Sequence, residues 1–360
     1  MEDRIEKTLS AMTLEQKCAL LTGDSAFGTR AFPGLGVPVL EFSDGPHGMR
    51  HQAAGANHLG IGGSEPATCF PTAVTAANTW NPEVCEELGR ALADEAASMG
   101  VAVVLGPGLN IKRSPLCGRD FEYFSEDPYL SGKMAAGYVR GIQENGLSAC
   151  PKHYAVNSQE TRRQSSDSVV DERTLREIYL SGFEALVKES HPMTIMTSYN
   201  LVNGEYANEN KHILKELLRD EFGFDGAIVT DWGGSNSHVG GVQAGSTFEM
   251  PAPGLDSVRE LIDAVRAGEL DEADVDTCVR DALRLIFSTR PTLDAATPGF
   301  DIDAHHEIAR KVAAEGIVLL KNDADEAGNK LLPLAEGTKV ALIGDFAETP
   351  RYQGAGSSLV

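Results

Sequence analysis

The sequence has few aromatic residues, few basic residues relative to acidic ones, and no long uninterrupted apolar run. Aromatic residues make up 6% of the 360 residues, whereas 42% are hydrophobic and 23% are charged. This balance is that of an ordinary globular protein rather than a disordered or fibrous chain. No stretch approaches the roughly 18 consecutive apolar residues of a membrane-spanning helix. We therefore expect no membrane partner.

Basic residues are scarce, which limits the kinds of partner that the protein can bind. The chain has 31 Lys and Arg against 53 Asp and Glu, a formal net charge of −22, and the acids are scattered along it. Binding to nucleic acid requires a basic face, so we expect no nucleic-acid partner. The start, Met1-Glu2-Asp3-Arg4, lacks the basic and then apolar segments of a secretory signal. We therefore expect a cytoplasmic protein.

Motifs for metals, phosphates and disulfide frameworks are also missing. The six cysteines include no Cys-x-x-Cys pair, so we interpret them as reduced core residues. His47 and His51 are four residues apart, but Pro46 and Gly48 break the helix that a metal-binding pair would need. Neither a phosphate-binding loop nor a Gly-x-Ser-x-Gly motif occurs. We expect neither a metal nor an organic cofactor.

What the chain does contain is an alternation of short β-branched runs with longer amphipathic segments. The runs expected to form strands are Val37–Phe42, Val101–Leu105, Leu147–Cys150, Thr194–Thr197, Ala227–Thr230 and Thr247–Met250. The segments expected to form helices are Glu83–Met99, Ser131–Asn145, Glu172–Glu189, Ile213–Phe222, Ser257–Ala267 and Ala273–Ile286. This alternation predicts an α/β fold with a parallel sheet, and we expect a (β/α)8 TIM-like barrel.

The pattern changes after the last of these helices, which predicts a second domain. Residues 1–290 are assigned to the barrel, and residues 291–305 to a linker that contains Pro and Thr. Residues 306–360 begin with a helix, followed by the apolar runs Ile317–Leu320 and Val340–Ile343, which we expect to be strand-like. We interpret residues 306–360 as the incomplete start of a second domain.

Polar residues directly follow most of the predicted strands. They are Asp44, Lys152 with His153, Tyr199, and Asp231 with Trp232. A barrel collects the carboxyl ends of its strands on one rim, so these distant residues are expected to meet in a single site. Arg119 and Arg163 add hydrogen-bond donors to a rim that is otherwise rich in acids.

The residue types alone leave the chemistry of this rim open. Asp231 beside Trp232 suits a nucleophile next to a sugar, because an indole can stack on a pyranose face. It equally suits a side chain that caps the following loop. Lys152 suits a Schiff base, a contact to hydroxyls or an anion, or a rim ion pair. His153 suits either a hydrogen-bonded core residue or a catalyst.

Five blocks of sequence, in a fixed order, resemble glycoside hydrolase family 3 and specifically its β-glucosidase-like members. They are Ser43–Gly48, Gly118–Pro128, Lys152–Tyr154 with Asn157–Glu160, Thr197–Asn200 with Asn203–Gly204, and Thr230–Gly233. In addition, Ala314–Asn322 is similar to the opening of the family's second domain, an α/β-sandwich. The resemblance therefore covers almost the whole chain and implies a catalytic barrel followed by the beginning of a sandwich.

The resemblance implies a retaining β-glycosidase, in the first place a β-glucosidase that removes terminal non-reducing β-D-glucosyl residues by double displacement. Asp231 matches the family's nucleophile, so a glycosyl-Asp231 intermediate is implied. The residues implied to hold the hydroxyls of the sugar are Asp44, Arg119, Lys152, His153, Arg163 and Tyr199, while Trp232 would flank the leaving group. The implied partner is a small-molecule or oligosaccharide β-glucoside. A homo-oligomer is compatible with the sequence.

A retaining mechanism also needs a second carboxyl group, about 5 to 5.5 Å from the nucleophile, to protonate the leaving oxygen. In this branch of the family the second domain contributes that group, so we expect it beyond residue 360. Glu122, Glu160 and Asp167 are conceivable substitutes, although nothing in their motifs recommends them.

Three other interpretations stay open. A β-xylosidase or another β-glycosidase of the same family would carry the same motifs. A Schiff-base aldolase or lyase would use Lys152 as its nucleophile. A non-catalytic sugar-binding relic would keep the residues that hold hydroxyls and turn nothing over.

Overall fold

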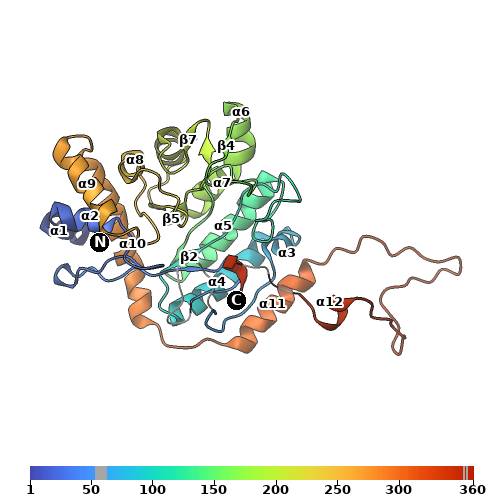
Figure 1. Cartoon of the computed structure of the whole chain (residues 1–360). Coiled ribbons are helices and arrows are strands. Elements are labelled where there is room, and N and C mark those ends of the chain that lie inside the picture. The colour runs from blue at the N-terminus through green and yellow to red at the C-terminus, as the bar shows by residue number, and fades with distance from the viewer. Residues whose placement is uncertain (53–62, 352, 354–355) are drawn as a thin grey trace.

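Short parallel strands form the interior of the molecule, and helices cover them (Figure 1). The computed structural model describes residues 1–52, 63–351, 353 and 356–360. Its strands are β1 Phe42–Asp44, β2 Val103–Leu105, β3 Ser148–Ala149, β4 Asp167–Ser168, β5 Thr194–Met196, β6 Leu201–Val202, β7 Glu205–Tyr206 and β8 Ala227–Val229. The α/β class is confirmed. β2, β3, β5 and β8 lie inside their predicted runs.

The first strand is displaced from its prediction. We expected a strand over Val37–Phe42, but β1 begins at Phe42 and continues to Asp44. Val37 and Leu40 are buried as a strand would require, yet Pro38 between them has no N–H to donate to a neighbouring strand. The apolar pattern therefore marked burial correctly but placed the strand too early.

Most predicted helices are present, with ends shifted by a few residues. The longer helices are α1 Glu2–Ala11, α4 Pro82–Ser98, α5 Pro128–Glu144, α7 Ser181–Ser190, α9 Leu255–Ala267, α10 Glu272–Ala295 and α11 Ile302–Glu315. The shorter ones are α2 Leu14–Leu20, α3 Ala73–Ala77, α6 Glu172–Thr174, α8 His238–Ala244 and α12 Asp345–Glu348, with 3-10 turns at Pro33–Leu35 and Gly356–Ser358. Leu175–Leu180 and His212–Glu221 are π-helical. Within the residues described, no helix is long and apolar enough to cross a bilayer.

Backbone pairing connects β1, β2, β3, β5 and β8 into one order, whereas β4, β6 and β7 form a separate small sheet. β1 pairs with β2 and β2 with β3, and β5 pairs with β8, all in parallel. Single parallel bridges extend this order: Tyr154 with Thr197, Val229 with Phe248, and Glu249 with Thr22. Antiparallel bridges then lead back towards β1: Gly23 with Thr29, and Gly28 with Glu41. Thr247–Met250 therefore contributes isolated bridges rather than a strand of its own.

Helices α4 and α5 lie against each other at very short range because glycines line their contact. A Cβ atom on Gly137 would lie 2.2 Å from the carbonyl oxygen of Pro82, and one on Gly141 would lie 2.1 Å from that of Glu86. Only a hydrogen atom fits at either position. This contact places β2 and β3, which follow the two helices in the chain.

The predicted linker over residues 291–305 is mostly helical. Helix α10 continues to Ala295 and α11 starts at Ile302, so the non-helical connection is limited to residues 296–301. The last turns of α10 persist despite Pro291 because Arg290 pairs with Asp294, and because Thr292 donates a 3.1 Å hydrogen bond to Asn145 O. The predicted linker therefore contains the end of α10 and the start of α11, and its role as a linker between domains stays a prediction.

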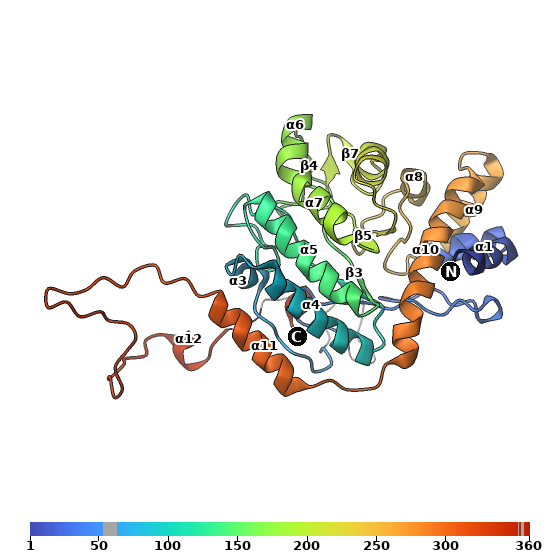
Figure 2. The same ribbon diagram turned by 180° about the vertical axis from the view of Figure 1, so that it is seen from behind.

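The apolar runs Ile317–Leu320 and Val340–Ile343 are not strands. Leu320 is 92% exposed and Ile343 is 88% exposed. A strand needs a neighbour to satisfy its backbone groups, and no strand or bridge is assigned to either run. From α11 the chain leads away from the body of the molecule, and residues 356–360 return to its centre (Figures 1 and 2). The division into domains stays a prediction.

Candidate active site

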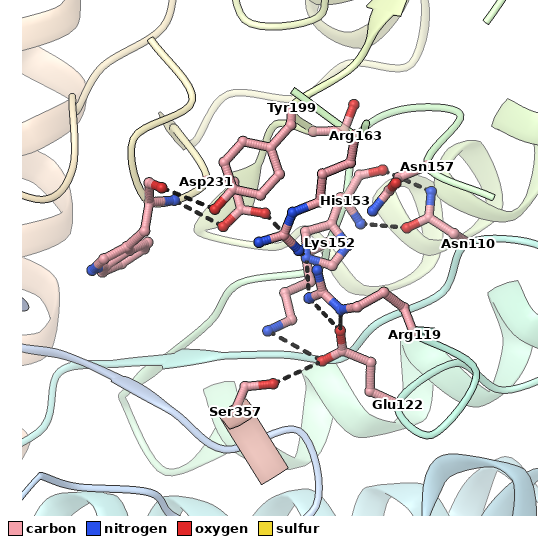
Figure 3. A network of polar contacts seen from close by, with 12 residues as sticks. Asn110, Arg119, Glu122, Lys152, His153, Asn157, Arg163, Tyr199, Asp231 and Ser357 are labelled. Carbon is pink, nitrogen blue, oxygen red and sulfur yellow. Dashed lines mark hydrogen bonds and ion pairs between the residues drawn. The ribbon is translucent and has the colours of Figure 1, made fainter. Parts of the chain in front are cut away.

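A pocket of about 410 Å³ opens where the chain leaves β1, β3 and β8. It brings together six of the eight predicted site residues: Asp44, Arg119, Lys152, Arg163, Asp231 and Trp232. Asp44 is the last residue of β1, while Lys152 follows β3 and Asp231 follows β8, so the parallel strands aim these side chains at one place. His153 and Tyr199 do not line the pocket but contact residues that do: His153 contacts Arg119 and Asp231, and Tyr199 contacts Trp232 (Figure 3).

The carboxylate of Asp231 has one oxygen held and one oxygen free. Its Oδ1 accepts the backbone N–H of Trp232 at 2.8 Å. Its Oδ2 accepts no hydrogen bond from the described residues and lies 3.5 Å from Nε2 of His153. Asp231 is 8% exposed and lines the pocket. Asp231 therefore lines the pocket with one carboxylate oxygen held by Trp232 and the other buried beside His153 without a hydrogen-bond partner among the described residues.

The imidazole of His153 is neutral and its tautomer follows from its neighbours. Burial, followed by the charges of Arg119 and Lys152, holds its pKa well below the usual range. Arg119 Nη2 lies 2.8 Å from Nε2 and can only donate, so Nε2 is the acceptor and Nδ1 carries the proton. Nδ1 is 3.0 Å from the hydroxyl of Tyr123. The ring is thus fixed from both sides.

Lys152 and Arg119 share a buried counter-ion, Glu122. Arg119 Nε donates to Glu122 Oε1 at 2.5 Å, and Lys152 Nζ lies 3.4 Å from Glu122 Oε2. Lys152 itself is 2% exposed. The Nζ of Lys152 is thus engaged by a buried carboxylate, which disfavours attack on a carbonyl by Lys152.

Tyr199 and Arg163 lie next to Asp231, and of these two only Arg163 lines the pocket. The hydroxyl of Tyr199 donates to the carbonyl of Trp232 at 2.9 Å, and the Arg163 guanidinium lies over the Tyr199 ring, 4.4 Å from its centre. Burial is the largest cause that raises the pKa of Tyr199, with the charge of Asp231 next, so the phenol stays protonated. Arg163 also pairs with Glu160 at 2.9 Å.

Trp232 is held by a hairpin from the N-terminal part of the chain. Its indole Nε1 donates to Ala26 O at 2.6 Å, and its ring lies against Phe27 with 5.2 Å between ring centres. Phe27 also lines the pocket. One edge of the pocket is therefore an aromatic surface built from two distant segments.

The pocket includes residues that the sequence analysis did not name, above all Arg50 and Ser357. Arg50 is 2% exposed, and its Nε donates to Leu359 O at 3.1 Å. Ser357 lies 3.5 Å from Glu122 Oε2 (Figure 3). Arg50 stands two residues after the Ser43–Gly48 block, and a basic residue so close to a rigid turn was a usable signal. Nothing in the sequence marks Ser357, because its contact joins residues 235 positions apart.

The three carboxylates considered as proton donors are all engaged elsewhere. Glu122 is fully buried, but Arg119 and Lys152 hold its pKa below the usual value against the effect of burial. Glu160 pairs with Arg163, and Asp167 accepts the backbone N–H of Gly204 at 3.1 Å and lines a different groove. Asp44 differs, since burial raises its pKa. No group of three or more His, Cys, Asp or Glu side chains in the described ranges is arranged to hold a metal ion.

Comparison with known sequences points to one family. The family model "Glycosyl hydrolase family 3 N terminal domain" matches residues 58–285. The chain is 46% identical over 354 residues to a thermostable β-glucosidase B of Acetivibrio thermocellus, which covers 98% of this chain and 46% of that protein. It is 43% identical over 363 residues to an exo-α-(1→6)-L-arabinopyranosidase of Bifidobacterium longum, covering 99% of this chain and 48% of the other.

Solved structures agree with this result. β-Glucosidase 3B from Thermotoga neapolitana, solved in complex with glucose, matches with a TM-score of 0.91 and 37% identity over 98% of this chain and 52% of that one. The GH3 β-glucosidase of Bifidobacterium adolescentis matches with a TM-score of 0.88 and 41% identity over 96% of this chain and 49% of that one. The chain thus spans about half the length of the relatives that it matches.

Proposed function

Because this chain belongs to glycosyl hydrolase family 3, we propose that it acts as a retaining β-glycosidase on terminal β-D-glucosyl residues. The observation that carries the proposal is the carboxylate of Asp231, which lines the pocket with one oxygen held by Trp232 N–H and the other without a hydrogen-bond partner among the described residues. Such a carboxylate is suited to attack the anomeric carbon and form a glycosyl ester. The similarity to β-glucosidases, one of them solved with glucose, supports glucose as the sugar.

The sugar is held, in this proposal, by the charged groups around Asp231. Arg119, Lys152 and Arg163 present donors, and Asp44 presents an acceptor, on the lining of the pocket. His153 and Tyr199 support this lining from behind, and Trp232 with Phe27 offers an aromatic surface to the leaving group. Positioning by several such contacts lowers the barrier because the reacting atoms are already aligned when the ester forms.

We also propose that the body is a TIM-like barrel whose ring is completed by the hairpin around residues 22–29. The parallel order β1-β2-β3 and β5-β8, extended by the bridges to Phe248 and Thr22, supports a closed ring. The site residues then lie at the carboxyl ends of the strands, as in other barrel enzymes. The general acid/base is proposed to come from outside residues 1–360, since Glu122, Glu160 and Asp167 are engaged elsewhere.

The test is to trap the intermediate. Incubation of the 360-residue chain with 2,4-dinitrophenyl 2-deoxy-2-fluoro-β-D-glucoside should leave one fluoroglucosyl ester, because fluorine slows both the formation and the breakdown of the intermediate. Peptide mapping by mass spectrometry should locate the ester on Asp231. The Asp231→Ala variant should take up no label.

Asp225→Ala is the matched control, because Asp225 is an exposed carboxylate just before β8 and lies outside the pocket lining. It should be labelled like the unaltered chain. A label on another carboxylate would refute the role of Asp231. Glucose binding without any ester would favour the sugar-binding relic, and borohydride trapping of a carbonyl substrate on Lys152 would favour the lyase. Parallel trials of aryl β-D-xyloside and α-L-arabinopyranoside would establish the sugar.

A further inference from the structure

We propose that Glu122 is a positioning residue, which fixes Arg119 and Lys152 for sugar binding without touching the sugar itself. The proposal rests on the proposed function, because it assigns a task to a group behind the same pocket. Glu122 does not line the pocket, whereas both of its cationic partners do.

Both oxygens of Glu122 are occupied from inside the protein (Figure 3). Oε1 accepts from Nε of Arg119 at 2.5 Å and also contacts Nη2 of the same guanidinium. Oε2 lies 3.4 Å from Nζ of Lys152 and 3.5 Å from Oγ of Ser357. The Glu122 side chain is 0% exposed. No oxygen of this carboxylate is therefore left to meet a ligand.

The environment of Glu122 also keeps this carboxyl group ionised, unlike that of a proton donor. Burial alone would favour the neutral acid, but the charges and hydrogen bonds of Arg119 and Lys152 outweigh burial and lower its pKa. The group is ionised and balances two cations that are themselves almost removed from water, with side chains 13% and 3% exposed. Without this charge, each cation would lose the partner that sets its orientation.

The effect of Glu122 extends one residue further through Arg119. The guanidinium that is held by Glu122 donates from Nη2 to Nε2 of His153, and Tyr123, the next residue after Glu122, contacts Nδ1 of the same ring. A single segment, Arg119–Tyr123, therefore orients side chains that stand after β3. Hydrogen bonds to charged groups of this kind change affinity by about 10- to 100-fold when one partner is lost.

The test compares sugars as well as variants. Glu122→Gln keeps the size of the side chain but removes the charge and turns an N–H₂ group toward a cation. Calorimetric titration of the 360-residue chain with D-glucose should show affinity about 10- to 100-fold weaker in this variant. Titration with 2-, 3-, 4- and 6-deoxy-D-glucose then gives the affinity penalty of each hydroxyl, which is the loss of affinity when that hydroxyl is removed from the sugar. If the variant has already lost the contact to a hydroxyl, removing that hydroxyl costs no further affinity.

The expected pattern is selective. In Glu122→Gln, the affinity penalty for removing the one or two hydroxyls that Arg119 or Lys152 holds should almost vanish. The affinity penalties for removing the other hydroxyls should stay as in the unaltered chain. Lys152→Met should abolish the penalty at one of those same positions. A folded Glu122→Gln or Glu122→Asp variant with unaltered penalties, or with all penalties reduced alike, would overturn the proposal. The Asp variant retains the charge but is too short to reach both cations, so it serves if the Gln variant does not fold.

Glu95→Gln is the matched control, because Glu95 is also 0% exposed, contacts Thr68 N at 3.1 Å and His305 Nδ1 at 2.7 Å, and neither it nor these two partners line the pocket. It should lower thermal stability and leave the deoxy-sugar pattern intact. If the unaltered chain binds neither D-glucose nor its deoxy analogues, the proposed function fails by itself. If the unaltered chain discriminates among the sugars and Glu122→Gln does so equally, only the role of Glu122 fails.

Discussion

The leaving group of the substrate should decide whether the 360-residue chain shows any turnover. Departure of an ordinary sugar alkoxide requires a proton, whereas dinitrophenolate departs without one. Glu122 and Glu160 are both held in ion pairs with cations of the site, and Asp167 lines another groove. None of these three carboxylates can supply the proton. Changing the leaving group therefore tests directly whether protonation of the leaving oxygen is missing.

The size of the effect follows from the acid assistance that is absent. General acid catalysis contributes about 10²- to 10⁴-fold in rate, which corresponds to about 3 to 5 kcal/mol of barrier. We expect this whole amount to be lost for cellobiose and almost none of it for 2,4-dinitrophenyl β-D-glucoside. The contribution of the hydroxyl contacts is shared by both substrates and cancels in the comparison.

The assay is a pre-steady-state measurement of dinitrophenolate release. The chain should give a burst of one equivalent and then slow turnover, because hydrolysis of the glycosyl ester also lacks a general base. Added azide should accelerate the second phase and yield β-glucosyl azide, since azide attacks the ester without needing a base. Asp231→Ala should show neither the burst nor the azide product.

Efficient cleavage of cellobiose by this chain would refute the reasoning. It would mean that a carboxyl group already in the pocket donates the proton, and Asp44 would then be the candidate because burial raises its pKa. In that event Asp44→Asn should abolish cellobiose cleavage while sparing the dinitrophenyl substrate. Retention of both activities in Asp44→Asn would exclude that group too.

Three further outcomes are expected. Burial lowers the pKa of His47 to about 4 from an ordinary 6.5, so between pH 6.5 and pH 4 the proton binds to the unfolded chain but not to the folded one. The free energy of unfolding therefore falls as the pH drops, by about 2 kcal/mol at pH 5. His47→Leu should remove this fall, which urea unfolding at pH 7 and pH 5 measures. If the difference in the free energy of unfolding between the two pH values is the same in the variant and the unaltered chain, the role of His47 is refuted. Gly141→Ala should destabilise the fold by about 1 to 3 kcal/mol, because its Cβ would clash at the contact between α4 and α5. Gly240→Ala should not destabilise it, because that Cβ would meet only side-chain atoms at 3.3 Å and beyond. Equal melting temperatures of the two variants would argue against the close helix contact. Of the two tryptophans, Trp80 is 71% exposed and Trp232 lines the pocket, so Trp80→Phe should retain the fluorescence change on glucose addition and Trp232→Phe should lose it.

Much of the fold could be predicted from local pattern. Short β-branched runs placed β2, β3, β5 and β8, and longer amphipathic segments placed most of the helices, because burial of these elements is encoded in neighbouring residues. The errors came where a distant contact decides the outcome. Helix α10 continues past Pro291 because Thr292 bonds to Asn145 of another helix's end, and Ile317–Leu320 lacks any partner strand among the described residues.

The site divides in the same way. The positions after the strands identified Asp44, Lys152 and Asp231 as candidates, since parallel strands carry the residues at their carboxyl ends to one edge. The sequence could not tell that Glu122 is an ionised counter-ion instead of an acid. That distinction depends on Arg119 and Lys152 both lying within reach of one buried carboxylate.

The sequence by itself determined the order of the elements, the polar residues that follow most of the predicted strands, and the family resemblance. The tertiary structure alone decided which oxygen of Asp231 is free, which nitrogen of His153 carries the proton, and that Ser357 and Arg50 belong to the pocket. The physical reason is one of range. Helix and strand preferences act over a few neighbouring residues, whereas hydrogen-bond partners, charge balance and burial are set by segments that packing brings together from far apart in the chain.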